Sequence, residues 1–228
     1  MAGATLSAPV TIFIPGGYGQ VTSARQPDGI NDLESGDIRF SSNAFVQGST
    51  VYLAHSVDLG SGRAGIRWYV IDLPTNAVTM HEISDPNFDF FYPSIAANSF
   101  GEVLIGFSRS GPGAGDFISS YAMACVNNGA VCDSPMLLRQ GLANYHLYAS
   151  GRNRWGDYSA TVIDPLDPRA FWTFQEYADS PTVGGVSRWA TQVTQINFVI
   201  PEPSTIWLVA GAGFLLLGRR LPRHAPRS

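Results

Sequence analysis

Short runs of β-branched and aromatic residues alternate with turn residues along most of the chain, a pattern typical of strands joined by tight turns. Turn residues cluster at 99–101, 110–115, 164–168 and 184–185. No segment before residue 199 has a convincing 3.6-residue apolar period, so the body is predicted to be all-β. The predicted strands are residues 11–14, 50–57, 66–72, 94–97, 103–108, 118–125, 158–163, 171–177 and 188–198.

The last 29 residues break this pattern. Pro201, Glu202 and Pro203 precede the run 205–218, which contains no charge, and arginines follow it directly. These arginines are Arg219, Arg220, Arg223 and Arg227. The pattern predicts a transmembrane helix whose arginines lie on the cytoplasmic side of the membrane.

The predicted span is short. Its 14 residues reach roughly 21 Å as a helix, against a hydrocarbon core of roughly 30 Å. It therefore spans only if Pro203 and Ser204 are included, with snorkelling arginines and a locally thinned bilayer. The alternative is a helix buried in the body, against which the arginines argue, because unpaired buried charge is costly.

Charge is distributed unevenly along the chain. All 14 basic residues are arginine; residues 1–199 carry 10 Arg against 17 acids, a net charge of −7, whereas the tail carries 4 Arg against 1 acid, +3. A net-negative body argues against nucleic acid as a partner, because phosphate neutralisation needs a basic surface.

The first seven residues have neither a basic nor an apolar segment, so they are not a signal peptide. A C-terminal membrane segment without an export signal is inconsistent, so we expect this chain to be the C-terminal part of a longer protein; the alternative is a start placed too late.

The order Pro201-Glu202-Pro203, apolar run and terminal arginines resembles the PEP-CTERM sorting signal of Gram-negative bacteria. The resemblance implies export across the inner membrane, transient retention there, and recognition and cleavage by an exosortase near the Pro-Glu-Pro motif. It implies a location in the cell envelope and then at the cell surface or in the extracellular matrix. The expected partners are the exosortase, the inner membrane and exopolysaccharide.

The body contains three similar stretches, each with small residues, an Asn or Asp turn, and then an apolar strand. They occupy residues 40–55, 93–107 and 158–174. Their strands begin 52 and 68 residues apart, at Val51, Val103 and Phe171, which leaves room for a four-stranded propeller blade in each interval. An ordinary β-sandwich is the alternative.

Segments 89–98, 106–111 and 154–159, with Phe171 and Trp172, resemble the sialidase-like propeller domains of secreted bacterial proteins. The resemblance implies a partial β-propeller of about three blades. We expect residues 1–36 to be an irregular remnant of a preceding blade, residues 37–198 to form the propeller-like domain, and residues 199–228 to be the sorting signal with its transmembrane helix.

The two cysteines flank a hairpin signal. If Asn128 and Gly129 form a two-residue turn, counting outward places Cys125 directly opposite Cys132. The Cα atoms would lie roughly 5.5 Å apart in a hydrogen-bonded pair, which a disulfide can bridge. We predict this disulfide, which suits an envelope protein. No histidine lies near enough in the sequence to complete a metal site, so neither a metal nor another cofactor is expected.

Some residues have the types that sialidase chemistry requires: two arginines for a carboxylate, and a Glu and a Tyr for the nucleophile pair. These are Arg152, Arg154, Glu176 and Tyr177. Glu176 and Tyr177 are neighbours in a predicted strand and point to opposite faces, so they cannot pair directly. We therefore expect no catalytic residues and no enzymatic activity in this chain. The alternative is a fragment of a secreted glycan hydrolase whose catalytic residues lie partly upstream.

Two further features suggest binding. The acid-rich loop 28–37 offers oxygen ligands for calcium, but its spacing does not match an EF-hand, and a solvated loop is the favoured alternative. An aromatic groove for sugars would make the chain a carbohydrate-binding module; the alternative for these aromatic residues is core packing. The candidate residues are Trp68, Tyr69, Phe90, Phe91 and Tyr92.

Overall fold

The computed structural model describes residue 3, residues 8–17, residue 19, and residues 21–36, 38–40, 43–156 and 159–199. The chain divides into two compact units, Met1–Asn197 and Phe198–Ser228. The Pro201–Glu202–Pro203 motif, the predicted transmembrane helix and its flanking Arg219, Arg220 and Arg223 lie outside the described residues. Within the described part of the chain, no helix is long and apolar enough to cross a membrane.

The first unit is all-β, as predicted, and its described residues contain no α-helix. Three larger antiparallel sheets follow one another along the chain, together with a small hairpin. Sheet 1 contains β1 (Phe45–Gln47), β2 (Thr50–Asp58), β3 (Ala64–Asp72) and β4 (Ala77–Ile83). Sheet 2 contains β5 (Asp89–Ala97), β6 (Val103–Ser110), β7 (Ser119–Val126), β8 (Val131–Cys132) and β9 (Met136–Arg139). Sheet 3 contains β12 (Ala160–Ile163), β13 (Ala170–Asp179) and β14 (Arg188–Asn197), and the hairpin is β10 (Tyr148–Ala149) with β11 (Arg152–Asn153).

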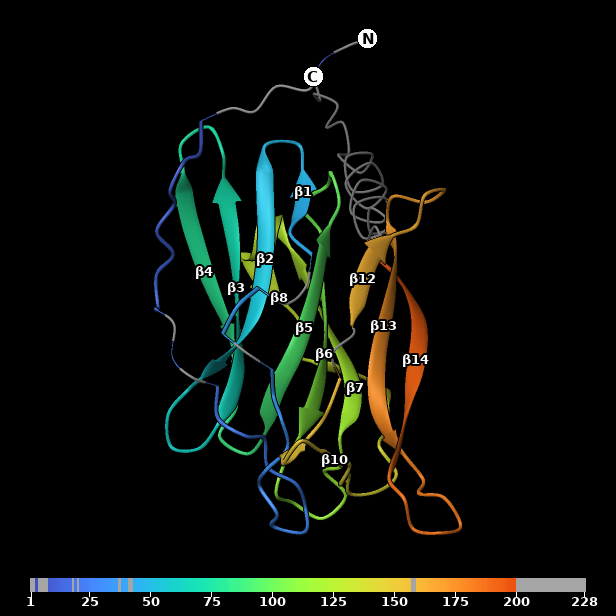
Figure 1. The fold of residues 1–228 in the computed structure, drawn as a ribbon. Helices are drawn as coiled ribbons and strands as arrows, with labels where there is room; N and C mark the ends of the chain where they lie inside the picture. Colours follow the sequence, from blue (N-terminus) through green and yellow to red (C-terminus); the bar gives the residue numbers. More distant parts are fainter. Residues whose placement is uncertain are drawn as a thin grey trace, which may run out of the picture. The chain divides into compact units, whose positions relative to one another are not determined.

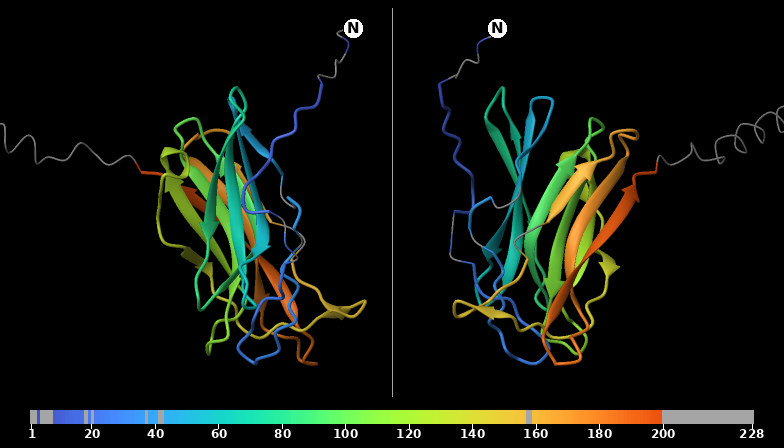
Figure 2. Two further views of the ribbon diagram at one scale, coloured as in Figure 1. Left: turned by 90° about the vertical axis from the view of Figure 1, so that its left-hand side faces the viewer. Right: turned by 45° about the vertical axis from the view of Figure 1, so that its right-hand side comes forward.

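The three sheets are stacked in chain order (Figures 1 and 2). Strand β5 of sheet 2 lies beside β2 of sheet 1 and also beside β12 of sheet 3. Consecutive strands pair throughout sheets 1 and 3 and from β5 to β8 in sheet 2, where β9 returns to pair with β7, so the sheets are largely local meanders that follow from short turns. The stack therefore arises from repetition along the chain.

Apolar aromatic side chains fill the interface between sheets 1 and 2. Trp68, Tyr52 and Phe107 are among its buried members. The rings of Phe90 and Phe107 meet edge to face at 5.6 Å, a favoured aromatic geometry.

The prediction that five aromatic residues line an exposed sugar-binding groove is wrong. The side chains of Trp68, Tyr69, Phe90, Phe91 and Tyr92 are all buried. Burial of so much apolar surface stabilises the stack, so core packing accounts for these residues.

Hydrogen-bonding side chains fill part of the interface between sheets 2 and 3. Ser94 Oγ lies 2.8 Å from Thr161 Oγ1 across the interface. Gln175 Nε2 donates to Ser94 Oγ and to Thr173 Oγ1, both at 2.9 Å. All four side chains are buried, and their mutual bonds offset part of the cost of removing polar groups from water, although Gln175 Oε1 accepts no hydrogen bond from the described residues.

The predicted strand at 11–14 is wrong, because those residues form no strand. Its Phe13 is 88% exposed, and β propensity acts through neighbouring strands, which this segment lacks among the described residues. The prediction missed β4, whose sequence AVTMHEI alternates only weakly between apolar and polar residues.

The predicted pairing of Cys125 with Cys132 and the disulfide between them are confirmed, but the predicted two-residue turn is wrong. Residues Asn127–Gly129 instead form a short 3-10 helix, η1, in which Asn127 and Asn128 both have φ 54° and Gly129 has φ 94°. Cys125 lies opposite Cys132, and the two are bonded. Their Cα atoms are 4.0 Å apart, less than the distance expected for a hydrogen-bonded pair. The adjoining residues carry the ladder bond instead, since Asp133 N–H donates to Ala124 O, so the cysteines are a non-hydrogen-bonded pair.

Replacing both cysteines by serine is expected to lower the free energy of unfolding by about 2–3 kcal/mol, the loop-closure value for so short a ring. Chemical denaturation of oxidised protein checks this value. Intact mass with and without reductant provides the control, since the native chain must gain two hydrogen atoms on reduction. Two free thiols in periplasmically expressed protein would contradict the pairing.

Candidate functional site

A cleft of about 560 Å³ lies between the N-terminal segment and the β10–β11 hairpin. Val21, Ser23 and Ile38 line it on the N-terminal side, together with Asp32 and residues 34–36, and Gly151 lines it on the hairpin side. Its most polar side chains are Asp32, Glu34, Arg152 and Asn153. The cleft is the candidate functional site because carboxylate, guanidinium and amide groups converge there.

Backbone pairing holds the N-terminal segment in place. Leu33 forms an antiparallel bridge with Ala24 and a parallel bridge with Asn153, and Glu34 N–H donates to Asn153 O at 3.0 Å. Leu33 and Ala24 are fully buried in a cluster that includes Tyr145 and Trp155. The segment is therefore a packed wall of the cleft although it contains no regular strand.

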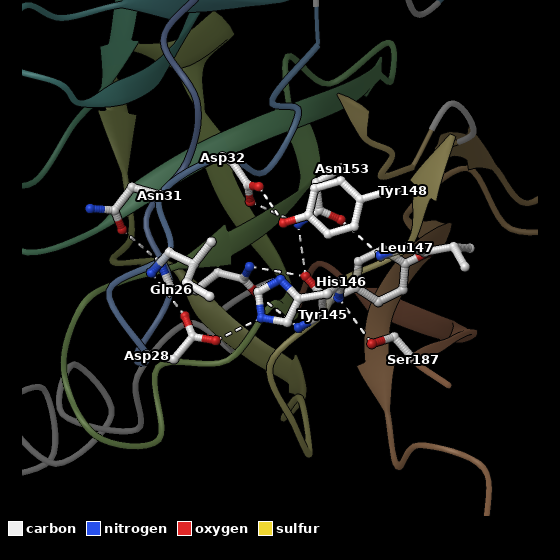
Figure 3. A network of polar contacts seen from close by, with 11 residues as sticks. Gln26, Asp28, Asn31, Asp32, Tyr145, His146, Leu147, Tyr148, Asn153 and Ser187 are labelled. Atoms are coloured by element: carbon white, nitrogen blue, oxygen red, sulfur yellow. Dashed lines mark hydrogen bonds and ion pairs between the residues drawn. The ribbon is translucent and has the colours of Figure 1, made fainter. Parts of the chain in front are cut away.

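A buried amide connects the same two segments (Figure 3). Gln26 Nε2 donates to Tyr145 O at 3.0 Å, and Tyr145 N–H donates to Gln26 Oε1 at 2.8 Å. Gln26 is fully buried, so both of its polar atoms need partners inside the protein, and the Tyr145 backbone provides them.

Asn153 and Tyr148 hold Asp32 (Figure 3). Asn153 Nδ2 donates to Asp32 Oδ1 at 3.0 Å and to Tyr145 O at 2.9 Å, while its Oδ1 accepts from Leu147 N–H at 2.9 Å. The Tyr148 hydroxyl donates to the same Asp32 carboxylate, and this bond raises the pKa of Tyr148. The amide of Asn153 therefore bonds with protein groups on both of its atoms.

His146, which follows Tyr145 in the chain, joins the same network of polar contacts. Its Nε2 lies 2.6 Å from Asp28 Oδ2, and its ring is stacked on that of Tyr148 with centroids 6.3 Å apart. Tyr148 is 55% exposed, so one flat aromatic surface of this loop faces solvent.

The two arginines of the sialidase-type set lie at this site, and both bind one carboxylate. Arg152 Nη1 is 3.0 Å from Glu34 Oε1, and Arg154 Nε is 3.3 Å from Glu34 Oε2. Two arginines beside one glutamate leave a net charge of +1. Their attraction for a substrate carboxylate is reduced because the Glu34 carboxylate already neutralises part of their charge.

The other two residues of that set lie elsewhere. Glu176 is buried beside Gly156 and contributes, after burial, to raising the pKa of Tyr145 to about 12. The ring of Tyr177 instead lies under Arg139, 5.3 Å from its guanidinium. The structure brings Arg152 and Arg154 together and keeps Glu176 and Tyr177 apart from each other.

The acids of loop 28–36 have separate partners: Asp28 binds His146, Asp32 binds Asn153 and Tyr148, and Glu34 binds the arginines. In the described ranges no three His, Cys, Asp or Glu side chains are placed to hold a metal ion. Asp37, the last acid of the predicted calcium loop, lies outside the described residues.

Backbone strain lies next to the cleft. Tyr92 has φ 51° at a bulge in β5, where its N–H donates to Ser56 Oγ at 3.1 Å and its carbonyl accepts from Ser159 Oγ at 3.1 Å. An aromatic residue rarely adopts this conformation, which costs about 1–3 kcal/mol and persists only where the surroundings enforce it. Gly36 lines the cleft, and a Cβ on it would lie 3.3 Å from Ser56 Oγ.

Sequence reasoning missed Gln26, Tyr145, His146, Tyr148 and Asn153. The Gln26–Tyr145 contact spans 119 positions, and no periodicity or spacing in the sequence indicates it. The only available signal was the density of polar residues between 22 and 37. No protein-family model matches the chain, and no curated protein matches it either.

Proposed function

We propose that this protein is a non-catalytic exported protein of the cell surface or extracellular matrix, sorted and processed through a C-terminal PEP-CTERM signal. The observation that carries the proposal is the order of three features: Pro201-Glu202-Pro203, an uncharged apolar run, and the arginine cluster that begins at Arg219. An extended Pro-Glu-Pro segment is open to an enzyme because proline prevents regular structure. The arginines favour retention with the chain end in the cytoplasm.

For the body, the proposal is a partial sialidase-like β-propeller of three blades. Sheets 1, 2 and 3 follow one another along the chain, and β5 lies beside both β2 and β12, so consecutive sheets pack against each other as adjacent blades do. The Cys125–Cys132 disulfide supports an oxidising location such as the envelope.

The cleft supports a binding or display role over hydrolysis. Its arginines bind Glu34, and Asp32 accepts from Asn153 and Tyr148. The pKa of Tyr145, raised to about 12 by burial and by Glu176, makes its phenol a poor nucleophile near neutral pH. These contacts weigh against the alternative of a glycan hydrolase.

Glu202→Ala tests sorting in an exosortase-bearing host that expresses the gene with an export signal. A hydrogen-bonded carboxylate is worth about 1.5–3 kcal/mol, so the processed and released fraction is expected to fall by about tenfold or more. The longer, unprocessed chain should accumulate in the membrane fraction, which immunoblots of fractionated cells measure.

Glu82→Ala is the matched control, since it removes a carboxylate of the body whose partner is the partly exposed Arg67, 3.2 Å away. It should be processed like the native protein. Unchanged cleavage and release of Glu202→Ala would refute the sorting signal.

A further inference from the structure

The outer face of sheet 3 is distinct from the cleft. On β13, Thr173 and Gln175 point toward sheet 2, so the alternate residues Trp172 and Phe174 point away from it. Cross-strand pairing places Val162 opposite Trp172, Val193 opposite Phe174, and Trp189 opposite Ala178. Trp172, Phe174, Val162, Val193 and Trp189 therefore share this outer face, which lies on the orange side of the stack in Figure 2.

This face is apolar and exposed. Trp189 is 52% exposed, Val193 46%, Val162 44% and Phe174 38%. The outer face of sheet 1 differs, because the chain's own N-terminal segment covers it (Figure 1): Tyr69 OH donates to Pro15 O at 3.3 Å, and Arg67 Nη1 donates to Gly16 O at 2.6 Å. An exposed apolar patch of this kind is often an interaction site.

The exposed side chains of β13 and β14 on this face are aromatic, aliphatic or neutral polar groups, with the Asp164 carboxylate beside Trp172 at its edge. On β14, Thr191 and Gln195 lie on this outer face and offer a hydroxyl group and an amide group. Glu176 of β13 also belongs to this face by register, but its side chain is buried. The charged pair Arg188–Asp179 belongs to the opposite face by register. Asp164 accepts from Trp172 Nε1 at 2.8 Å, which fixes the indole. A complementary ligand therefore has apolar C–H faces, neutral hydroxyl groups and no net charge.

The area of the patch decides between two occupants. Its four most exposed side chains present an apolar area on the order of 300 Å². A standard protein interface needs about 800 Å² per partner, so this patch is too small to hold a second copy of the chain by itself. Strands β13 and β14 pair over ten consecutive residues without a bulge, which makes the face a rigid platform for an extended ligand.

We propose that the outer face of sheet 3 binds a neutral polysaccharide, with sugar rings stacked on Trp189 and Phe174 and hydroxyl groups bonded to Thr191 and Gln195. This inference rests on the proposed function, because a matrix protein meets such polymers. Purified full-length protein in detergent micelles provides the test. Retention is measured on cellulose and chitin beads and by affinity electrophoresis in hydroxyethyl cellulose, with anionic alginate for comparison.

The native protein is expected to bind at least one neutral polymer and not alginate. Trp189→Ala should weaken binding by about tenfold, the effect of removing one stacking ring. Trp189→Phe keeps a ring and should retain most of the affinity. Phe13→Ala, which removes an aromatic residue that is 88% exposed outside this face, should bind like the native protein, whereas loss of binding in Tyr148→Ala would assign the ligand to the cleft. Equal melting temperatures would show that the variants are folded.

Four results would overturn the proposal: no retention by any neutral polymer, stronger binding to alginate, full retention of Trp189→Ala, or loss of binding in Tyr148→Ala alone. A native dimer that Trp189→Ala converts to a monomer, measured by light scattering without polymer binding, would assign the face to a second copy instead. None of these results affects the processing of Glu202→Ala, so failure here is separable from failure of the sorting proposal.

Discussion

Gly106→Ala is expected to lower the free energy of unfolding by about 3 kcal/mol, from overpacking and from broken buried hydrogen bonds. Gly106 lies on β6, where a Cβ would come within 2.2 Å of Gln175 Nε2 and 2.3 Å of Thr173 Oγ1. The added methyl group must displace Gln175, whose amide bonds Ser94 and Thr173 in a fully buried setting. Denaturant titration monitored by tryptophan fluorescence measures the loss.

A double mutant separates this clash from a general effect of replacing glycine. In Gly106→Ala/Gln175→Ala the shortened side chain leaves room for the methyl group, so the double variant should be more stable than the sum of the single effects by about 1 kcal/mol or more. Gly184→Ala is the control, because a Cβ at this position would lie 3.8 Å from Thr182 Oγ1, an ordinary van der Waals contact. Strict additivity of the two substitutions would show that Gln175 does not clash with the added methyl group.

Asp89→Ala is the second large effect, expected at about 3 kcal/mol, the lower end of the range for breaking a buried ion pair. Asp89 is fully buried, and its Oδ2 accepts from Arg25 N–H and Arg25 Nε, each at 2.8 Å. Its Oδ1 accepts from Ala64 N–H at 2.9 Å. The substitution leaves these donors without an acceptor at the junction of the N-terminal segment with sheets 1 and 2.

Hydrogen exchange adds a local readout to the unfolding measurement. Because Asp89 fixes Arg25, amides in residues 21–36 should lose protection more than those of sheet 3. Glu82→Ala again serves as the control, since its partly exposed pair with Arg67 is worth about 1 kcal/mol or less. Stability within about 1 kcal/mol of the native protein would show that Asp89 is not a required link.

Local sequence patterns predicted the strands that pair with their chain neighbours. Strand β3 has a near-continuous apolar run, and β14 follows a Gly-Gly turn signal, so both were predicted within a few residues of their bounds. The hairpin register at Cys125 and Cys132 also followed from a short local rule, the Asn-Gly turn. The segment 11–14 shows the limit of such rules, because an apolar run forms a strand only when another strand pairs with it.

The cleft could not be predicted in this way. Arg152 and Arg154 are the residue types expected for carboxylate binding. The carboxylate that both of them bind is that of Glu34, which lies 118 positions before Arg152 in the chain, so the sequence did not indicate the contact. The aromatic residues 68, 69, 90, 91 and 92 likewise have the composition of a sugar-binding groove, yet sheet stacking buries them. Composition indicates which side chains are capable of a function, whereas exposure decides which of them are available for it.

The sequence by itself determined the all-β class, the hairpin with its disulfide, and the tail pattern on which the sorting proposal rests, because each depends on residues close together in the chain. The tertiary structure decided which charges neutralise one another, which aromatic rings are buried, and which face of sheet 3 remains exposed. Those outcomes depend on how strands and loops from distant parts of the chain pack, and this packing determines which polar groups bind each other and which surfaces stay in contact with water.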